Sequence, residues 1–560
     1  MQRLYTVPGE TLTGTPWARY PRPQMVRQDW LCLNGPWSLT WGGETATIRV
    51  PFCPESLLSG VEPPPRCGEE MIYRRTFSLP EGWSGKRVLL HFGAVNRVAV
   101  AALNGVEVAR HGNGYLPFSA EITDALRSGE NELTVRVVND LSPKHPWGKQ
   151  RLDRGGMWYT PVSGIWQTVW LEAVPEVYIR SLTLRTGADF ALITAEGVTD
   201  GTVTLEGRDY PLSHGQARIR LEHPILWSPE HPHLYRFSVT CGEDRVESYF
   251  ALRTLSTQRV GGVPRLCLNG KPYFFHGLLD QGYWSDGLYT PAVPECYEQD
   301  ILSAKALGFN TLRKHIKIEP EQFYYDCDRL GMVVFQDMVN CGTYAYLRDT
   351  VLPTLGLLHR RDRRLHRDPE TRQNFLDAME GTVRLLANHP CICLWTIFNE
   401  GWGQFCADDA YRRLRALDDT RWIDATSGWF HQRESDVDSL HIYFQKLHLG
   451  RKPLPQLLSE FGGYSCTVPA HSFRPEAVYG YRKYTDRNTF VGDLRALYES
   501  RLLPLVPQGL CGAVYTQLSD VEDETNGLLT YDRRVQKVRP EELADIARRL
   551  QEAIRPAGQD

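Results

Sequence analysis

Two short apolar runs of the chain each end in a glutamate. The first covers residues 392–398 and ends at Asn399 and Glu400, before Gly401 interrupts it. The second covers residues 455–459 and ends at Glu460, before Gly462 and Gly463. A continuous apolar run is typical of a parallel strand that is buried on both faces. We therefore expect two strand ends that bring two carboxylates to one substrate.

Other apolar runs also end in polar side chains. These residues are Asp280, Gln281, Arg313, His315, Asp337, His441, Tyr443 and Gln517, with Trp284, Trp402 and Trp429 nearby. Each could simply cap a strand, but the C-terminal ends of barrel strands converge on one mouth. Charged and amide groups at that mouth would hold hydroxyls, and an aromatic ring would cover an apolar ring face. This combination predicts a sugar-binding site.

The chemistry expected of the two glutamates is double displacement at an anomeric carbon. Carboxyl groups about 5–5.5 Å apart give retention, because one attacks as nucleophile while the other protonates the leaving oxygen and then activates water. Glu460 is the candidate nucleophile, with Tyr443 as a possible hydrogen-bond partner, and Glu400 is the candidate acid/base. Spacing alone does not assign these roles. No His, Cys or Asp spacing indicates a metal, and no cofactor is expected.

The elements that must position these residues alternate between apolar runs and helical patterns from residue 259 onward. Strands are predicted near residues 273, 310, 332, 392, 422, 439, 456 and 512, and helices at about 296–307, 320–330 and 369–388. Strand–helix alternation of this length predicts a (β/α)8 TIM barrel. We expect residues 259–560 to form this catalytic barrel.

Two all-β regions precede the predicted barrel. Residues 1–175 hold short alternating runs separated by turn dipeptides such as Asn104-Gly105, which predicts a jelly-roll sandwich. Residues 176–258 hold more short strands without candidate chemistry, and we interpret them as a spacer with an immunoglobulin-like β-sandwich fold. The irregular, aromatic stretch 141–164 is expected to reach over a site made elsewhere.

Composition excludes several other classes of protein. The net charge of -4 gives no global field that would attract nucleic acid or an anionic membrane. No run approaches the roughly 18 apolar residues of a transmembrane helix, and residues 1–8 lack a signal-peptide apolar region, so a cytoplasmic location is expected. The 13 Cys residues are scattered and expected to be reduced, with Cys391 and Cys393 as small core residues.

Several of these segments resemble glycoside hydrolase family two, which contains β-galactosidases, β-glucuronidases and β-mannosidases. Residues 395–400 (Trp-Thr-Ile-Phe-Asn-Glu) resemble its acid/base signature, and residues 459–462 (Ser-Glu-Phe-Gly) resemble its nucleophile segment. Residues 71–77, 103–105, 114–118 and 129–135 are similar to its sugar-binding jelly roll, 163–167 and 226–229 to its markers around the immunoglobulin-like domain, and 268–272 and 308–313 to the start of its barrel.

This resemblance covers nearly the whole chain and implies retaining hydrolysis of a terminal β-linked sugar. It implies that Glu400 is the acid/base, that Glu460 is the nucleophile, that Asn399 holds the 2-hydroxyl and that Tyr443 orients the nucleophile. Hydrogen bonds to the 2-hydroxyl strengthen in the transition state. A β-galactosidase-like activity is predicted first. The alternatives are a uronic acid, mannose or arabinose type of sugar, an endo-acting enzyme, and an inactive carbohydrate-binding protein. Under each of these readings the protein is a candidate homo-oligomer.

Departures from the family pattern concern the sugar rather than the reaction. The β-glucuronidases of the family carry an Asn-x-Lys motif, but here Leu528 stands two residues after Asn526, which disfavours a glucuronide. Residues 313–317 read Arg-Lys-His-Ile-Lys instead of the commoner Arg-x-Ser-His-Tyr-Pro. Lys317 could meet an anionic sugar, although a solvated loop lysine is the simpler interpretation.

Overall fold

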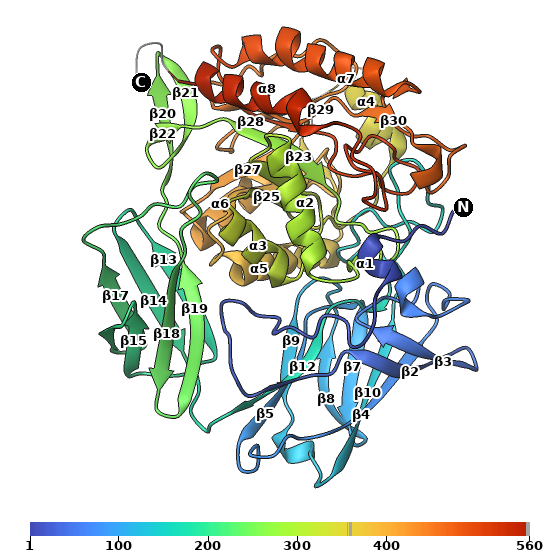
Figure 1. Ribbon diagram of the computed structural model, residues 1–560, viewed down its shortest axis with the longest axis vertical. Helices are drawn as coiled ribbons and strands as arrows, with labels where there is room; N and C mark the ends of the chain where they lie inside the picture. The colour runs from blue at the N-terminus through green and yellow to red at the C-terminus, as the bar shows by residue number, and fades with distance from the viewer. Residues whose placement is uncertain (355–356, 358–360, 556–560) are drawn as a thin grey trace.

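A β-sandwich forms the N-terminal part of the computed structural model, which describes residues 1–354, 357 and 361–555 (Figure 1). Its six-stranded sheet has the order β3 (Glu44–Val50), β2 (Gly35–Trp41), β4 (Met71–Ser78), β10 (Glu130–Val138), β7 (Val98–Leu103) and β8 (Val106–His111). Its four-stranded sheet has the order β1 (Trp30–Cys32), β12 (Val169–Val174), β5 (Arg87–Phe92) and β9 (Phe118–Glu121). The short strands β6 (Val95–Asn96) and β11 (Gly164–Ile165) form a separate pair.

Alternation of apolar and polar residues explains this sandwich. In β10, Leu133, Val135 and Val137 are buried while the residues between them are exposed or half-buried. Side chains of a strand point alternately to opposite faces, so this pattern gives one apolar face. The apolar faces of the two sheets enclose a shared core, to which Trp37 and Tyr73 belong. The predicted sandwich fold of this region is confirmed.

A second, smaller sandwich follows and is attached to the barrel. Its three-stranded sheet has the order β13 (Ser181–Thr186), β14 (Phe190–Glu196) and β17 (Gln216–Arg220). Its four-stranded sheet has the order β16 (Arg208–Leu212), β15 (Gly201–Leu205), β18 (Tyr235–Cys241) and β19 (Asp244–Phe250). The indole of Trp227 donates to the carbonyl oxygen of Asp328 at 2.7 Å, and the hydroxyl of Tyr249 donates to the carboxylate of Asp328 at 2.7 Å. These buried contacts fix the small sandwich to the barrel.

Eight parallel strands form the barrel, as predicted. In sheet order they are β27 (Trp422–Ser427), β26 (Ile392–Asn399), β25 (Val333–Asp337), β24 (Thr311–Lys314), β23 (Phe275–Asp280), β32 (Leu510–Tyr515), β29 (Gln456–Phe461) and β28 (Asp438–Ile442). Nearly every residue in them is buried, as expected for strands that are covered on both faces. The C-terminal ends of these strands meet at one mouth.

Helices surround the barrel and begin or end at recognisable signals. They are α2 (Glu295–Ala306), α3 (Glu321–Leu330), α5 (Pro369–Leu386), α6 (Ala407–Leu417), α7 (Arg487–Ala496) and α8 (Pro540–Ala553), with the short helices α1 (Val7–Glu10) and α4 (Leu352–Thr354) elsewhere. The Asp368 side chain accepts from the backbone N–H of Thr371 at the start of α5, where Pro369 is the first helical residue. Helix α3 ends at Gly331, which has a φ of 74°.

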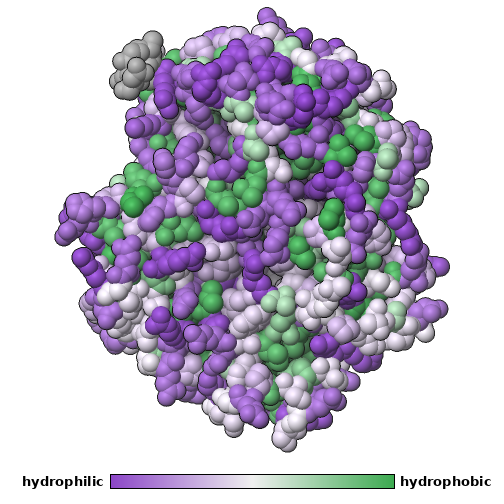
Figure 2. Space-filling model, in the orientation of Figure 1, coloured by the Kyte–Doolittle hydropathy of each residue, from purple (hydrophilic) through white to green (hydrophobic). Residues whose placement is uncertain are grey.

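Smaller sheets complete the fold. On the face drawn in Figure 2, hydrophobic residues lie in separate patches among hydrophilic ones. The strands β20 (Leu255–Val260), β21 (Val263–Leu268) and β22 (Lys271–Pro272) lead into the barrel, and β30 (Tyr464–Cys466) pairs with β31 (Arg482–Tyr484). All 13 cysteines are free thiols, and Cys391 and Cys393 are buried in the core. Within the described part of the chain, no helix has the length and apolar character needed to cross a membrane.

Candidate active site

The mouth of the barrel gathers polar side chains from five of the eight strands, namely the neighbours β24, β25 and β26 and the neighbours β28 and β29. Arg313 lies on β24, Asp337 ends β25, Asn399 ends β26, His441 lies on β28 and Glu460 lies on β29. His441 and Glu460 are register partners in the parallel pair of β28 and β29. Convergence of these residues follows from the parallel barrel, since the C-terminal ends of all its strands lie at one rim.

Glu460 is a buried carboxylate that two strong donors hold in place. One guanidinium nitrogen of Arg313 donates to Glu460 Oε1 at 3.0 Å, and the hydroxyl of Tyr443 donates to Glu460 Oε2. Burial alone would raise the pKa of Glu460, but the cationic groups around it, led by His441 and Arg313, outweigh burial and lower the pKa to about 2. Glu460 is therefore ionised at neutral pH.

Arg313 organises the floor of the site through all of its guanidinium nitrogens. Nε donates to Asp337 Oδ1 at 3.0 Å, Nη2 donates to Asn399 Oδ1 at 2.8 Å, and Nη1 reaches Glu460. The side chain is only 1% exposed. The rigid fork of an arginine therefore fixes three strand ends relative to one another. Its bond to the amide oxygen of Asn399 turns the amide nitrogen elsewhere, and that Nδ2 is buried without a partner among the described residues.

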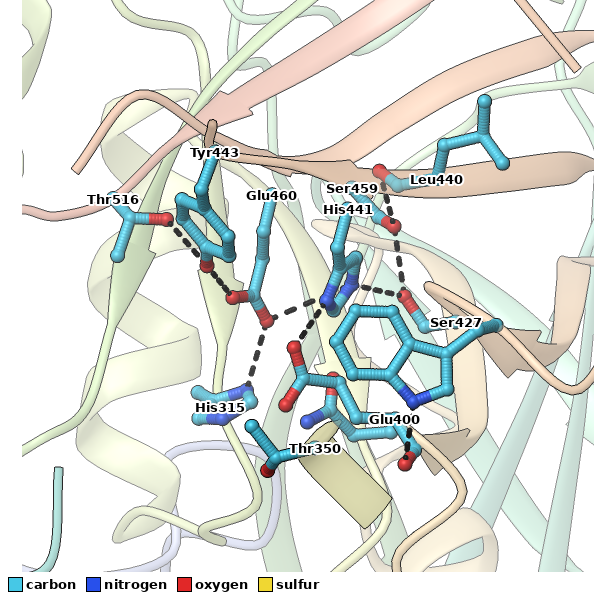
Figure 3. Close-up of polar contacts among 12 residues, drawn as sticks. His315, Thr350, Glu400, Ser427, Leu440, His441, Tyr443, Ser459, Glu460 and Thr516 are labelled. Carbon is cyan, nitrogen blue, oxygen red and sulfur yellow. Dashed lines mark hydrogen bonds and ion pairs between the residues drawn. The ribbon is translucent and has the colours of Figure 1, made fainter. Parts of the chain in front are cut away.

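Glu400 differs from Glu460 in position and in environment. It follows the end of β26 with a φ of 51°, which is unusual for a residue with a Cβ atom, and its side chain is 13% exposed. Its carboxylate lies 2.8 Å from His441 Nδ1, and its backbone oxygen accepts from the indole of Trp429 at 3.0 Å (Figure 3). Glu400 is thus more exposed than Glu460, whose side chain is 6% exposed, and no guanidinium pairs with it among the described residues.

Glu400 and Glu460 lie close enough to act on one bond. One oxygen of Glu400, one oxygen of Glu460 and one ring nitrogen of His441 lie within 4.8 Å of one another. Inverting enzymes hold their carboxyl groups about 6.5–9.5 Å apart to admit a water, whereas retaining enzymes hold them about 5–5.5 Å apart. The same three groups could ligate a cation, so the sequence-based expectation of no metal stays a prediction.

Histidine and tryptophan side chains complete the predicted set. His315 Nδ1 lies 2.8 Å from Asp337 Oδ2 and 4.0 Å from Glu460 Oε1. Burial, with a smaller contribution from the charge of Lys149, lowers the pKa of His315 to about 4, so the ring is neutral at pH 7. The ring of Trp402 lies edge-on to His315, with 6.4 Å between the centroids. The indole nitrogen of Trp402 has no hydrogen-bond partner within the described chain.

The irregular stretch 141–164 of the N-terminal sandwich does reach the barrel mouth. Trp158 packs on Trp402 with 5.3 Å between ring centroids, and also contacts Trp147 and Tyr344. The hydroxyl of Tyr159 donates to the carboxylate of Glu524, which lies beyond the last barrel strand. One wall of the site therefore comes from the N-terminal sandwich.

Three of four further residues singled out in the sequence contact protein groups other than the two glutamates. Asp280 accepts from the ammonium of Lys314 at 2.6 Å, and Gln517 donates to Asn526 at 2.9 Å. Gln281 is buried, with an unpartnered amide nitrogen among the described residues. Lys317 is 1% exposed and pairs with Glu319 at 2.9 Å. The interpretation of Lys317 as a solvated lysine was therefore wrong, because a carboxylate two residues away neutralises it inside the protein.

Sequence reasoning missed several residues at the same mouth. Ser427 ends β27, and its hydroxyl lies 3.0 Å from His441 Nε2 and donates to Ser459 Oγ at 2.8 Å. The strand-end rule that found Asn399 would also have found Ser427. Tyr481 stacks on Tyr443 with 3.8 Å between centroids, and Lys149 lies over the Trp402 ring. Both come from loops, which give no comparable signal in a single sequence.

Two close carboxylates at a barrel mouth are the arrangement that glycoside hydrolysis needs, and three family models match the chain. Residues 263–458 match the TIM barrel domain of glycosyl hydrolases family 2, residues 66–190 match the family 2 galactose-binding domain-like model, and residues 185–253 match a further family 2 model. The chain belongs to glycosyl hydrolases family 2.

Individual relatives are distant in sequence but close in fold. A β-galactosidase of Thermoanaerobacter pseudethanolicus is 26% identical over 48% of this chain and 39% of its own length, and a β-glucuronidase of Mus musculus is 26% identical over 70% and 65%. The chain thus spans less than two thirds of these curated relatives. Among solved structures, a β-glucuronidase of an uncultured Clostridium species has a TM-score of 0.72 at 19% identity, with 94% of this chain and 99% of that chain covered. A β-galacturonidase of Eisenbergiella tayi has a TM-score of 0.69 at 20% identity, with the same coverage.

Proposed function

We propose that the protein is a retaining exo-β-glycosidase that hydrolyses a terminal β-linked sugar by double displacement. The observation that carries this proposal is the contrast between two carboxylates whose oxygens lie within 4.8 Å of each other. Glu460 is held ionised, which suits a nucleophile. Glu400 is the more exposed of the two and has no paired guanidinium among the described residues, which suits an acid/base that exchanges protons with a leaving group and with water. Membership of family 2 supports this assignment.

The steps follow from these positions. Glu460 attacks the anomeric carbon while Glu400 transfers its proton to the departing oxygen, which leaves a covalent glycosyl–enzyme intermediate. Glu400, now ionised, removes a proton from water, and this water displaces Glu460 from the same face that the leaving group occupied. Tyr443 and Arg313 orient the attacking carboxylate through their hydrogen bonds. The unpartnered amide nitrogen of Asn399 is available to donate to a sugar hydroxyl.

The sugar, the domain boundaries and the exo-acting mode are also proposals. A β-galactoside is the sugar predicted first from the sequence, and the β-galactosidase of Thermoanaerobacter pseudethanolicus supports it. We also propose the three-domain division at residues 1–175, 176–258 and 259–560. The wall that Trp158 contributes to the mouth favours a closed pocket, and hence an exo-acting enzyme. A cytoplasmic location and a homo-oligomer stay predictions.

A panel of nitrophenyl β-glycosides tests the proposal. The wild type should release nitrophenol from at least one of the galactoside, glucoside, mannoside, arabinoside, glucuronide and galacturonide. Glu460→Gln should lose this activity by several orders of magnitude while it still binds the sugar, because an amide cannot form the glycosyl ester. Failure of the wild type on every sugar, with sugar binding retained, would instead identify an inactive carbohydrate-binding protein.

A further inference from the structure

Lys149 brings a cation to the barrel mouth from another part of the chain. It lies between β10 and β11 of the N-terminal sandwich, and its backbone oxygen accepts from the N–H of Tyr159 at 2.9 Å. The residue is 7% exposed. Its ammonium lies over the ring of Tyr159, 5.6 Å from the centroid, and over the ring of Trp402, 5.8 Å from the centroid.

The ammonium of Lys149 has no hydrogen-bond or ion-pair partner among the residues that the structure describes. The other buried lysines in this part of the chain are all paired with carboxylates: Lys314 with Asp280 and Glu319, Lys317 with Glu319, and Lys537 with Asp520. The ammonium of Lys149 lies over two aromatic rings and its charge acts on Glu460, but it forms no hydrogen bond or ion pair within the described residues, so it can pair with an anion that a ligand supplies.

The surroundings of Lys149 are those of a binding site rather than of a packed core. Lys149 lies over the ring of Trp402, which is edge-on to His315, and its charge lowers the pKa of both His315 and Glu460. The indole nitrogen of Trp402 and both amide atoms of Asn340 are buried at the same mouth, and none has a partner within the described residues. Asn340 also accepts, through its backbone oxygen, from Trp147 of the segment that carries Lys149. The indole N–H of Trp402 and the amide N–H groups of Asn340 are therefore available to donate hydrogen bonds to a polar ligand.

We propose that the ammonium of Lys149 binds the carboxylate of a uronic acid, so that the preferred substrate is a β-linked uronide. This inference rests on the proposed function and replaces the β-galactoside, which the sequence predicted first, with a uronide as the preferred sugar. The absence of lysine at position 528 disfavoured a glucuronide in the sequence. Lys149 supplies a cation from a different segment, which a search for one local motif cannot reveal. A neutral hydroxyl could accept a hydrogen bond here but could not form an ion pair with the ammonium.

Pairs of substrates that differ only at C6 test this inference. Nitrophenyl β-D-galactoside is compared with the galacturonide, and the glucoside with the glucuronide. Hydrogen bonds to charged groups contribute about 1.5–3 kcal/mol, so kcat/KM for the acidic sugar should exceed that for its neutral partner by about 10- to 100-fold in at least one pair. Lys149→Met should abolish this preference, and Lys149→Arg, which keeps the charge, should retain part of it.

A matched control is available in the same segment. Lys144 is exposed and pairs with Glu370 on the surface, so Lys144→Met removes the same charge without touching the mouth. This variant should keep the wild-type ratio between acidic and neutral sugars. Because Lys149 also acts on Glu460, Lys149→Met is expected to change the rates for both sugars, and the informative quantity is the ratio within each pair.

Binding measurements separate this inference from the proposed function. Calorimetry of the wild type and of Lys149→Met with free galacturonate, galactose, glucuronate and glucose needs no turnover. Tighter binding of the acid than of its neutral partner, lost in Lys149→Met, supports the inference even if no glycoside is hydrolysed. Equal or weaker binding of both acids, or equal losses for acidic and neutral sugars in Lys149→Met, would overturn it, while turnover of neutral glycosides would leave the proposed function standing.

Discussion

Glu460 shows how one side chain acquires a role from its neighbours. Burial alone favours the neutral carboxyl, yet the pKa is lowered to about 2 because Arg313 and His441 face it. Glu400 is the same residue type in a more exposed position, with its carboxylate 2.8 Å from His441 Nδ1. Environment, not residue type, therefore separates the proposed nucleophile from the proposed acid/base.

The unfolding free energy should depend on pH through the ionisation of Glu460. Its folded pKa of about 2 lies below the ordinary value of 4.5, so the ionised form stabilises the fold above about pH 4.5, and this contribution is lost as the pH falls towards 2. The difference in unfolding free energy between wild type and Glu460→Gln, from urea titrations, should thus be smaller at pH 3 than at pH 7.

A surface variant serves as the control for this measurement. Glu206 is exposed in the turn between β15 and β16, so Glu206→Gln should differ little from the wild type at both pH values. A difference for Glu460→Gln that stays constant or grows between pH 7 and pH 3 would contradict the assignment of Glu460 as the strongly ionised carboxylate.

The end of β24 shows how one strand organises the site. Arg313 joins Asp337, Asn399 and Glu460, so three other strands depend on it. Arg313→Met should lower the unfolding free energy by about 3–5 kcal/mol, because it leaves buried carboxylates without a counter-ion. Urea unfolding of the variant at neutral pH measures this loss.

An exposed arginine provides the comparison for Arg313. Arg185 pairs with Asp419 on the surface, with both side chains more than half exposed, and Arg185→Met should cost about 0–1 kcal/mol. Similar losses of unfolding free energy in the two variants would show that the Arg313 network stabilises the fold no more than a surface ion pair does.

The elements also show which features a single sequence can reveal. Barrel strands such as Ile392–Asn399 were predictable because a continuous apolar run and a terminal glycine are local signals. Glu400 and Glu460 were predictable for the same reason, since each follows such a run. The hydrogen bonds of Arg313 to Asp337, Asn399 and Glu460 join segments that are far apart in the chain, as does the contact of Lys149 with Trp402. A single sequence does not reveal such contacts. The burial of Lys317 likewise depends on the tertiary fold, which charge alone does not indicate.

At the scale of the whole molecule, the N-terminal sandwich takes part in the site. Trp158 packs on Trp402, Trp147 and Tyr344 at the mouth. Trp158→Ala should raise KM by about tenfold, since each aromatic pair is worth about 0.5–1.5 kcal/mol and its loss loosens the wall of the pocket. Steady-state kinetics on the best substrate of the nitrophenyl panel measures this change.

A tryptophan elsewhere in the same sandwich separates stability from binding. Trp83 is buried in the sandwich core, away from the mouth cluster that contains Trp158. Trp83→Ala should lower the unfolding free energy by about 3–5 kcal/mol but leave KM of the folded protein unchanged. An unchanged KM in Trp158→Ala would mean that this wall does not contact the substrate.

Azide rescue tests the central assignment of the two glutamates most directly. In Glu460→Ala the nucleophile is missing, so azide should attack the anomeric carbon of an activated glycoside directly and give the glycosyl azide of inverted configuration. In Glu400→Ala the covalent intermediate still forms, and azide should give the retained product, because it replaces a water that needs a base. The inverted azide from Glu400→Ala, with the retained azide from Glu460→Ala, would contradict the assignment and reverse the two roles.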